Sequence, residues 1–472
     1  MPANIKFGTD GWRAVIAEDY TFDNVRICAQ AVADYLKESG LAERGLIIGH
    51  DTRFAAEAFA AAAAEVTSAS DIKTYLCREA APTPVVSFGV TAKQAGGAII
   101  ITASHNPPQW NGFKLKTETG TSASPEITAR LEEHIARLQR EGGVKRRPLT
   151  PDNDAFEYVD LTPVYDQQIT KLVDLDNIRR AGLKIAIDPM FGAGMGYFRR
   201  LLGGGASEII EINSERNPLF PGMKQPEPIA ENLTRLVATV RERGAAVGIA
   251  TDGDADRVGI VAEDGSFIST LHTFTLLCLY LLEVRGERGA IIRTVTMSNM
   301  IHRLGELFNV PIYETPVGFK YVAPKMRQEN ALIGGEESGG YAFQGHVLER
   351  DGILAGLYFL DLMVRTGKSP RELIEYLHSK VGPHYYQRHD IKITGDKAAI
   401  IERVKNHAPE EIAGQTVAKR DQIDGDRFTL ADGAWLLVRF SNTEPLLRLY
   451  AEGHSPEQVT ALLAEAEKLA QG

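Results

Sequence analysis

The chain has 472 residues, of which 44% are hydrophobic and 24% are charged, and its formal net charge is −10. A chain of this length and composition folds into several globular domains of about 100–200 residues each. The acidic balance argues against nucleic acid as a partner, because binding to phosphate backbones needs a basic surface.

The cysteines and the N-terminus point to a reducing compartment. Cys28, Cys77 and Cys278 are scattered, odd in number and form no Cys-x-x-Cys pair, which argues against a disulfide framework. The first residues lack the basic-then-apolar pattern of a signal peptide, and no apolar run has the length of a membrane span. We therefore expect a cytoplasmic protein with no membrane partner.

The first third of the chain alternates helices and strands. Apolar residues at Phe22, Val25, Val32 and Leu36 have the spacing of an amphipathic helix over 22–38. This alternation predicts a largely parallel α/β sheet. Strands are expected at 46–49 and 97–103, and an alanine-rich helix is expected at about 55–66.

Two further α/β blocks follow the polar stretch 142–154. Ser369-Pro370-Arg371-Glu372 has the form of a capping box with proline at the first helical position, so a helix is expected to begin there. The predicted strands are 183–188, 247–251, 258–262, 290–293 and 331–334, and the predicted helices lie near 298–308 and 352–365.

The last hundred residues have a different pattern. Strands are predicted at 435–439 and 446–451, and a second capping sequence at Ser455 starts a terminal helix. Asp424-Gly425-Asp426-Arg427 is interpreted as a hairpin turn. This part of the chain is expected to form a smaller α+β unit.

A serine loop follows the predicted strand that ends at Ala103. It reads Thr102-Ala103-Ser104-His105-Asn106-Pro107-Pro108-Gln109-Trp110-Asn111-Gly112-Phe113-Lys114. Ligand sites in α/β folds lie at the carboxyl ends of strands, and the two prolines make the loop rigid. A serine nucleophile needs a base and nearby positive charge, so Lys114 is a candidate base and His105 a candidate orienting group. The alternative is a polar turn whose serine and asparagine cap backbone groups.

An aspartate loop follows the predicted strand 247–251. Asp252, Asp254 and Asp256 alternate along Thr251-Asp252-Gly253-Asp254-Ala255-Asp256-Arg257, and three carboxylates this close favour a bound divalent cation. An ordinary acidic surface turn is one alternative. An EF-hand, with Glu263 at its twelfth position, is another. That loop needs glycine where Arg257 stands, and its flanks should be helices.

Two later loops have groups suited to sugars and phosphates. Gly334-Gly335-Glu336-Glu337-Ser338-Gly339-Gly340 places carboxylates and a hydroxyl between glycines, where a ligand can approach closely. Arg439-Phe440-Ser441-Asn442-Thr443-Glu444-Pro445 combines an arginine, hydroxyls and turn amides, which suits a phosphate. Either segment could instead be an ordinary polar turn.

Together these segments resemble the α-D-phosphohexomutase superfamily, which comprises phosphoglucomutases, phosphomannomutases and phosphoglucosamine mutases. The resemblance runs over essentially the whole chain, with the motifs in the family's order. It implies four domains around a central cleft: three similar α/β domains with mixed sheets and a smaller C-terminal α+β domain. The expected boundaries are 1–150, 151–258, 259–372 and 373–472.

The resemblance also implies a role for each matching residue. Ser104 resembles the phosphorylated serine, and Lys114 resembles the family's proposed general base. Metal ligands are expected at Asp252, Asp254, Asp256 and the phosphorylated Ser104; basic or orienting groups around the phosphoryl group at Arg13, His105, Lys114 and Arg257; sugar-recognition residues at Lys320, Glu336 and Ser338; and ligands of the non-reacting phosphate at Arg439, Ser441, Asn442 and Thr443.

The implied activity is interconversion of glucose 1-phosphate and glucose 6-phosphate, with Mg²⁺ as cofactor and glucose 1,6-bisphosphate as activator and intermediate. Thr315-Pro316-Val317-Gly318-Phe319-Lys320 and the Glu336 loop look most like phosphoglucomutases. Asn442 is similar to the branch that also accepts mannose phosphates, whereas the Glu337-Ser338 pair departs from phosphoglucosamine mutases. A monomer and a homodimer are both left open.

Two other functional classes compete with this reading. Glycines 192, 194 and 196 suggest a dinucleotide-binding dehydrogenase, but Tyr197 stands where that pattern needs its third glycine. A non-catalytic sugar-phosphate sensor on the same fold should lack the serine, the aspartates or the lysine, and this chain has all of them.

Overall fold

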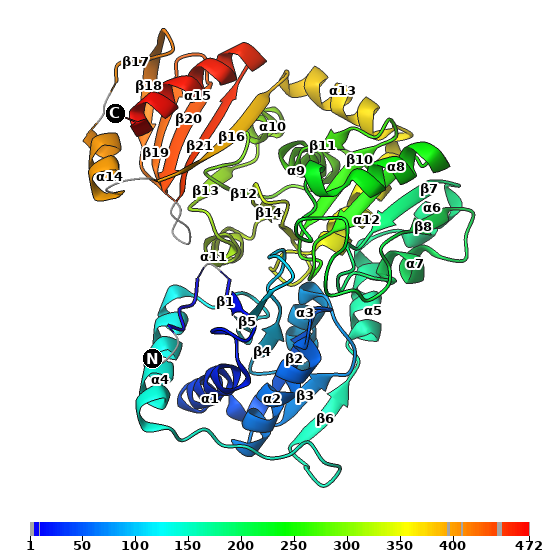
Figure 1. Ribbon diagram of the computed structural model, residues 1–472. Coiled ribbons are helices and arrows are strands. Elements are labelled where there is room, and N and C mark those ends of the chain that lie inside the picture. Colours follow the sequence, from blue (N-terminus) through cyan, green and yellow to red (C-terminus); the bar gives the residue numbers. More distant parts are fainter. Residues whose placement is uncertain (1–3, 9, 394–396, 407–408, 441–445, 472) are drawn as a thin grey trace.

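The computed structural model contains four sheets that follow one another along the chain (Figure 1). It describes residues 4–8, 10–393, 397–406, 409–440 and 446–471. The fourth unit, orange to red, and the first unit, blue, lie at opposite ends in this view, and the second and third units lie between them. The fold is therefore three α/β units followed by an antiparallel unit, as the sequence predicts, although the boundaries at 150, 258 and 372 remain predictions.

The first sheet has the order β1-β5-β4-β2-β3-β6. Strands β2, β3, β4 and β6 pair in parallel, but β5 runs antiparallel to both β4 and β1. This unit contains β1 (Trp12–Val15), α1 (Phe22–Glu38), η1 (Ala42–Arg44), β2 (Leu46–His50), α2 (Ala56–Ala69), β3 (Thr74–Cys77), α3 (Thr83–Lys93), β4 (Ala98–Ile101), β5 (Trp110–Lys116), α4 (Pro125–Glu141) and β6 (Phe156–Val159).

The second sheet has the order β11-β10-β9-β7-β8, and β10 turns back antiparallel to β9 after the aspartate loop. Its elements are α5 (Thr162–Leu172), α6 (Leu175–Arg180), β7 (Lys184–Asp188), α7 (Tyr197–Leu202), β8 (Glu208–Glu211), η2 (Ala230–Asn232), α8 (Thr234–Arg243), β9 (Val247–Thr251), β10 (Val258–Ala262) and β11 (Phe267–Ile268).

The third sheet has the order β13-β12-β14-β15, with an antiparallel edge at β15. The predicted capping box is confirmed, since Ser369 and Glu372 cap each other's backbone at the start of α13. The elements are α9 (Thr270–Leu279) with its π-helical continuation η3 (Tyr280–Val284), β12 (Ile291–Thr294), α10 (Met300–Phe308), β13 (Ile312–Thr315), α11 (Phe319–Glu329), β14 (Ile333–Gly335), β15 (Tyr341–Phe343), α12 (Gly352–Thr366) and α13 (Pro370–Val381).

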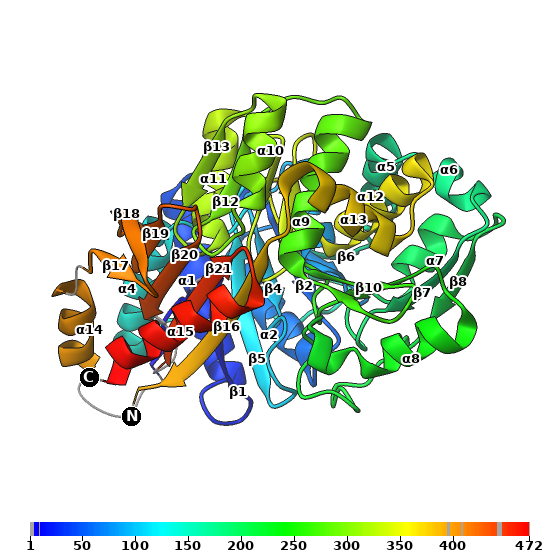
Figure 2. The same cartoon turned by 90° about the horizontal axis from the view of Figure 1, so that it is seen from above.

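The fourth sheet is antiparallel throughout, in the order β16-β21-β20-β19-β18-β17, and the view from above shows α15 lying along it (Figure 2). The hairpin turn predicted at 424–427 lies where β18 is joined to β19, although Asp426 and Arg427 already belong to β19. The elements are β16 (Tyr385–Lys392), α14 (Lys397–Asn406), β17 (Glu411–Ile412), β18 (Gln415–Asp421), β19 (Asp426–Leu430), β20 (Trp435–Phe440), β21 (Leu446–Gly453) and α15 (Pro456–Gln471).

Each α/β sheet is mixed, as the family resemblance implies, and the parallel pairings predicted for the first sheet lie among β4, β2, β3 and β6. The serine loop and the aspartate loop are both followed by a strand that returns antiparallel beside the one just left, β5 beside β4 and β10 beside β9. A short loop can join antiparallel neighbours, whereas parallel neighbours need a longer crossover. Each loop therefore lies at the end of its strand pair, where the serine loop and the aspartate loop can meet.

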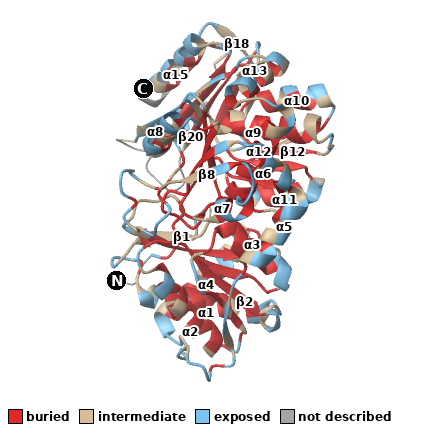
Figure 3. Ribbon diagram, turned by 90° about the vertical axis from the view of Figure 1, so that its right-hand side faces the viewer, coloured by how far each residue is buried: buried red, intermediate tan, exposed pale blue. Residues whose placement is uncertain are grey.

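Buried residues, red in Figure 3, run through the units. One large core cluster spans the first three units, a second lies within the first unit, and the fourth unit has its own. The large core joins residues as distant as Ile47, Ile249 and Leu357. The fourth unit contacts the third through a small apolar cluster that contains Val295 and Trp435. Among the described residues, no helix combines the length and the apolar character needed to cross a membrane.

Ion pairs also join the third and fourth units. The guanidinium of Arg427 donates to both oxygens of Glu314, each at 2.6 Å, and Arg293 pairs with the same carboxylate. Burial alone would raise the pKa of Glu314, but the two arginines hold it at about 2. Because this folded-state pKa lies below the ordinary value, the stabilisation is complete above about pH 4.5 and is lost as the pH falls toward 2.

Glu314→Gln is therefore expected to destabilise the protein by roughly 2–3 kcal/mol near neutral pH, since it leaves two buried arginines undercompensated. Calorimetric unfolding between pH 3.5 and 7.5 tests this. The difference between wild type and variant should be constant above pH 5 and should shrink below pH 4. Glu306→Gln, in an exposed pair with Arg303, should have no measurable effect. An undiminished Glu314→Gln effect at pH 3.5 would contradict the assignment.

Candidate active site

Ser104 is buried in the loop between β4 and β5 and points at the aspartate loop of the second unit. Its Oγ donates to Oδ2 of Asp252 at 2.9 Å and lies 3.3 Å from Nδ1 of His105. Its φ of +54° is left-handed, a conformation that costs a non-glycine residue about 1–2 kcal/mol. Backbone strain at a buried serine beside a carboxylate is consistent with the functional role predicted for Ser104.

The aspartate loop gathers three fully buried carboxylates between β9 and β10. Asp252, Asp254 and Asp256 each offer one oxygen, and these oxygens lie within 4.8 Å of one another; no other such group occurs among the described residues. The buried Oδ1 atoms of Asp254 and Asp256 accept no hydrogen bond from any described residue. Oxygen-only ligands with free lone pairs fit a hard divalent cation.

The EF-hand reading is contradicted. The loop is flanked by strands, and Glu263 turns away to accept a hydrogen bond from Oγ of Ser369 at 2.6 Å. Gly253 explains why the two loops meet so closely, because a Cβ at this position would lie 2.5 Å from the carbonyl oxygen of Ser104.

The pKa values of the triad aspartates are shifted in different directions. Burial raises the pKa of Asp252 well above its usual value, and repulsion from Asp254 and Asp256 adds to the effect. Burial also disfavours the charged form of Asp254, but its contacts with Lys114 and Thr83 outweigh this and lower its pKa. A divalent cation among the three carboxylates would remove the repulsion.

Lys114 extends from β5 into the same cluster. Its Nζ lies 2.7 Å from Oδ2 of Asp10, 2.8 Å from Oδ2 of Asp254 and 3.3 Å from Oδ2 of Asp256. Burial would lower the pKa of Lys114, but these carboxylates together raise it, so the amine holds its proton. Accepting a proton requires that the carboxylate charge be compensated first, and its role as a base remains a prediction.

The other predicted basic residues surround the serine. The backbone N–H of Arg257 donates to Oδ1 of Asp252, and its guanidinium donates to Glu227, both at 3.0 Å. Arg13 donates to Oδ1 of Asn106 at 2.6 Å. Burial, with Arg257 and Arg13 nearby, lowers the pKa of His105 well below its usual value, so its imidazole is neutral.

Glu336 joins the cluster through Arg350. The Nη2 atom of Arg350 lies 2.6 Å from Oδ2 of Asp10 and 2.7 Å from Oδ2 of Asp256, while its Nη1 lies 3.7 Å from Glu336. Burial raises the pKa of Glu336, although Arg350 opposes the shift. One guanidinium thus connects the metal-type triad with the predicted sugar loop.

The remaining predicted residues lie apart from this cluster. Lys320 is the second residue of α11, and Ser338 is half-buried in the loop after β14. Arg439 is the last residue but one of β20, where its Nε lies 2.9 Å from Asp424. Within the described residues, these three make no direct contact with the triad. Ser441, Asn442 and Thr443 lie outside the described residues.

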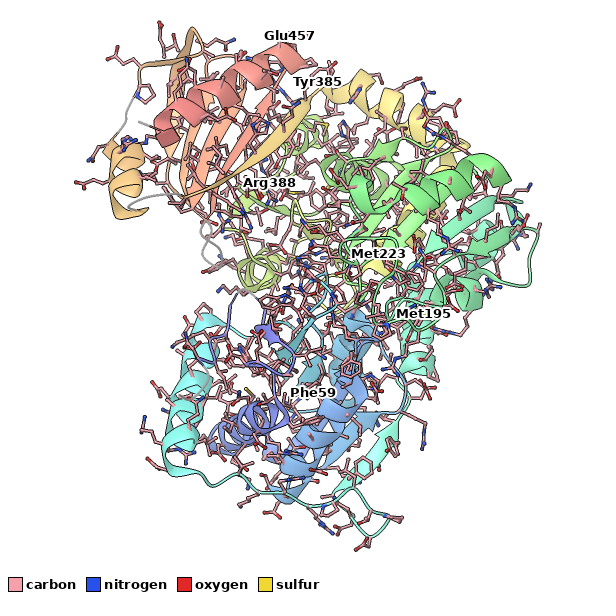
Figure 4. The ribbon with its side chains drawn as sticks, viewed as in Figure 1. Phe59, Met195, Met223, Tyr385, Arg388 and Glu457 are labelled. Atoms are coloured by element: carbon pink, nitrogen blue, oxygen red, sulfur yellow. The ribbon has the colours of Figure 1, made fainter. Side chains whose placement is uncertain are left out.

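The fourth unit contacts the sugar loop directly. Arg388 lies on β16 where the fourth unit meets the third (Figure 4), and its Nη1 is 3.5 Å from Glu337. The Tyr386 hydroxyl donates to the same carboxylate at 3.3 Å. The predicted sugar loop therefore connects the triad side of the site with the fourth unit.

Sequence reasoning missed several buried charged residues of the site. Asp51 and Arg53 directly follow β2, and Glu349 and Arg350 precede α12; all four are buried. The sequence does contain a signal for Asp51 and Arg53, because charged residues just after an apolar strand lie where α/β folds bind ligands. Arg350 gave no comparable signal.

Models of one family match all four parts of the chain. They describe phosphoglucomutase/phosphomannomutase alpha/beta/alpha domain I at residues 4–141, domain II at 163–265, domain III at 271–381 and the C-terminal domain at 396–469.

Relatives resemble the chain over nearly their whole length. A phosphoglucomutase/phosphomannomutase of Thermococcus kodakarensis is 31% identical and covers 98% of both chains. A probable phosphoglucosamine mutase of Pyrococcus abyssi is 33% identical, over 98% of this chain and 97% of the relative. The crystal structure of a putative phosphomannomutase from Thermus thermophilus superposes with a TM-score of 0.86, at 35% identity over all of both chains.

Proposed function

Because the chain belongs to the phosphoglucomutase/phosphomannomutase family and is thus a phosphohexomutase, an intramolecular phosphotransferase, we propose that it interconverts glucose 1-phosphate and glucose 6-phosphate. The observation that carries the chemistry is the Ser104 hydroxyl, 2.9 Å from a buried aspartate triad. Thr315–Lys320 and the Glu336 loop support glucose as the sugar.

In the proposed cycle, phosphorylated Ser104 gives its phosphoryl group to a free hydroxyl of the bound sugar phosphate. The bond from phosphorus to the serine oxygen breaks as the bond to the sugar oxygen forms. The hydroxyl proton passes to Nζ of Lys114, which requires that the neighbouring carboxylates be charge-compensated and that the amine has first given up its own proton. The resulting glucose 1,6-bisphosphate reverses its orientation in the site and returns its other phosphoryl group to Ser104. Free glucose 1,6-bisphosphate would therefore activate the unphosphorylated enzyme.

Charge compensation is the main task of the surrounding residues. Asp252, Asp254, Asp256 and the phosphate on Ser104 would hold Mg²⁺, which when bound supplies a positive charge to the transferring phosphoryl group. The unpartnered oxygens of Asp254 and Asp256 support this ligand set. Arg257 and Arg13 add positive charge, and neutral His105 orients the serine hydroxyl.

Recognition of the substrate is assigned to the third and fourth units. Glu336 and Ser338 would accept and donate hydrogen bonds with sugar hydroxyls, and Lys320 lies in the loop expected to choose the sugar. Arg439, with Ser441, Asn442 and Thr443, would bind the non-reacting phosphate.

The unpaired, buried cysteines Cys28, Cys77 and Cys278 support the predicted cytoplasmic location.

Values of kcat/KM on glucose, mannose and glucosamine 1-phosphates, with the matching bisphosphate supplied, test the choice of sugar. We expect glucose 1-phosphate to be preferred over glucosamine 1-phosphate by at least about tenfold, because differing hydrogen-bond groups at one ring position leave site groups unpaired. The runner-up is mannose 1-phosphate. A preference for glucosamine would overturn the proposal in favour of the activity named for the Pyrococcus relative, and no turnover of any of the three would favour a sensor.

A further inference from the structure

The segment that follows β2 holds the Ser104 carbonyl directly and the Ser104 N–H through Thr102. The Ser104 N–H donates to Oγ1 of Thr102 at 2.8 Å, and Thr102 donates in turn to Oδ2 of Asp51 at 2.6 Å. On the other side, the Ser104 carbonyl accepts from Nη2 of Arg53 at 2.7 Å. Asp51 and Arg53 pair with each other, with Nε of Arg53 3.3 Å from Oδ2 of Asp51.

Arg53 holds the rest of the serine loop as well. Its side chain is completely buried, and it donates to three more carbonyls of the loop: Asn106 at 2.6 Å, Pro107 at 3.0 Å and Trp110 at 3.1 Å. Four carbonyl oxygens thus converge on one planar guanidinium. A lysine amine is a single point with three donors, so it cannot reproduce this spread of contacts.

The same segment is anchored in the second unit, which carries the aspartate triad. Thr52 donates from Oγ1 to the carbonyl of Phe191 at 2.7 Å, and the Arg53 guanidinium lies 5.1 Å from the centre of the Phe220 ring. The loop at Phe191 in turn supports the aspartate loop, because Ala193 N–H donates to the carbonyl of Gly253 at 2.9 Å. Residues 51–53 therefore fix the position of the serine loop relative to the aspartate loop.

We propose that Arg53 is a positioning residue for phosphoryl transfer: together with Asp51 and Thr102 it holds Ser104 in its left-handed conformation, with Oγ aimed at the triad. Arg53 contacts no reacting atom and acts only through the loop. This inference rests on the proposed function of Ser104 as the phosphoryl carrier.

Arg53→Lys keeps the buried positive charge but cannot form all four hydrogen bonds to the loop carbonyls. We expect kcat to fall by about 10²-fold with KM changed by less than about threefold, because displacing a reacting atom by about 1 Å costs this much. Intact-mass analysis after incubation with glucose 1,6-bisphosphate and Mg²⁺ should show slower phosphorylation of Ser104. Thermal unfolding would be measured on the same samples.

Arg293→Lys is the matched control. Arg293 is also buried and donates to two carbonyls, those of Met297 and Ser298, but it lies in the third unit. It should lose comparable stability while Ser104 is phosphorylated at the wild-type rate. Equal slowing in both variants would reduce Arg53 to a general structural role and overturn the inference.

Thr102→Val gives a second test if Arg53→Lys does not fold. It removes the hydroxyl that accepts from Ser104 N–H, and phosphorylation should again slow with KM preserved. Wild-type rates in the folded Thr102→Val and Arg53→Lys variants would refute the inference while leaving the proposed function intact. If wild-type Ser104 is itself never phosphorylated, the proposed function fails instead.

Discussion

Ser104→Ala is expected to lower kcat by at least about 10⁴-fold, since a covalent carrier that is removed cannot be replaced by its neighbours. The alanine variant should also take up no phosphate from glucose 1,6-bisphosphate, as measured by intact mass. Because the lost hydroxyl makes a single hydrogen bond to Asp252 and a longer contact to His105, the free energy of unfolding should change by only about 1 kcal/mol.

Ser68→Ala is the control for removing a buried serine hydroxyl from the same unit. Ser68 donates from Oγ to the carbonyl of Ala64 within α2, outside the serine loop. This variant should keep wild-type kcat and wild-type phosphorylation. Substantial turnover by Ser104→Ala, or phosphate uptake at another residue, would refute the assignment of Ser104 as carrier.

Asp252→Asn is expected to lower kcat/KM by about 10³-fold or more at fixed Mg²⁺, because several kcal/mol of transition-state stabilisation depend on the cation site. Calorimetric titration should show much weaker Mg²⁺ binding. The metal-free variant should be as stable as wild type or more stable, because burial and the neighbouring aspartates already disfavour the charged form of Asp252.

Asp264→Asn provides the comparison for Asp252→Asn. Asp264 lies in the exposed turn between β10 and β11, where it caps Ser266, and its loss should leave activity and Mg²⁺ binding unchanged. Chelation of wild-type enzyme should reproduce the loss of activity, and added Mg²⁺ should restore it. Full activity of Asp252→Asn or of chelated enzyme would contradict a metal-dependent site.

The local elements were predictable from the sequence because their signals are local. The amphipathic spacing predicted a helix at 22–38, where α1 lies, and the apolar runs predicted strands at 247–251 and 258–262, where β9 and β10 lie. The Ser369 capping box likewise depends on four consecutive residues. The composition of the loops that follow these strands is an equally local signal, and it predicts that they contain the reactive groups.

Strand direction and the ion-pair partners of the buried charged side chains were not predictable from such local signals. The antiparallel pairing of β5 and β10 depends on the neighbour that each strand finds after folding. Asp10 and Arg350 are 340 residues apart, yet they meet at 2.6 Å. No spacing rule connects such residues.

By itself the sequence determined many of the helices and strands and the four loops rich in reactive groups, because periodicity, capping and loop composition act between near neighbours. Only the tertiary structure decided that Asp10 and Arg350 belong to the site. A buried charge is stable only beside a compensating partner, and here those partners come from different loops and units of the chain.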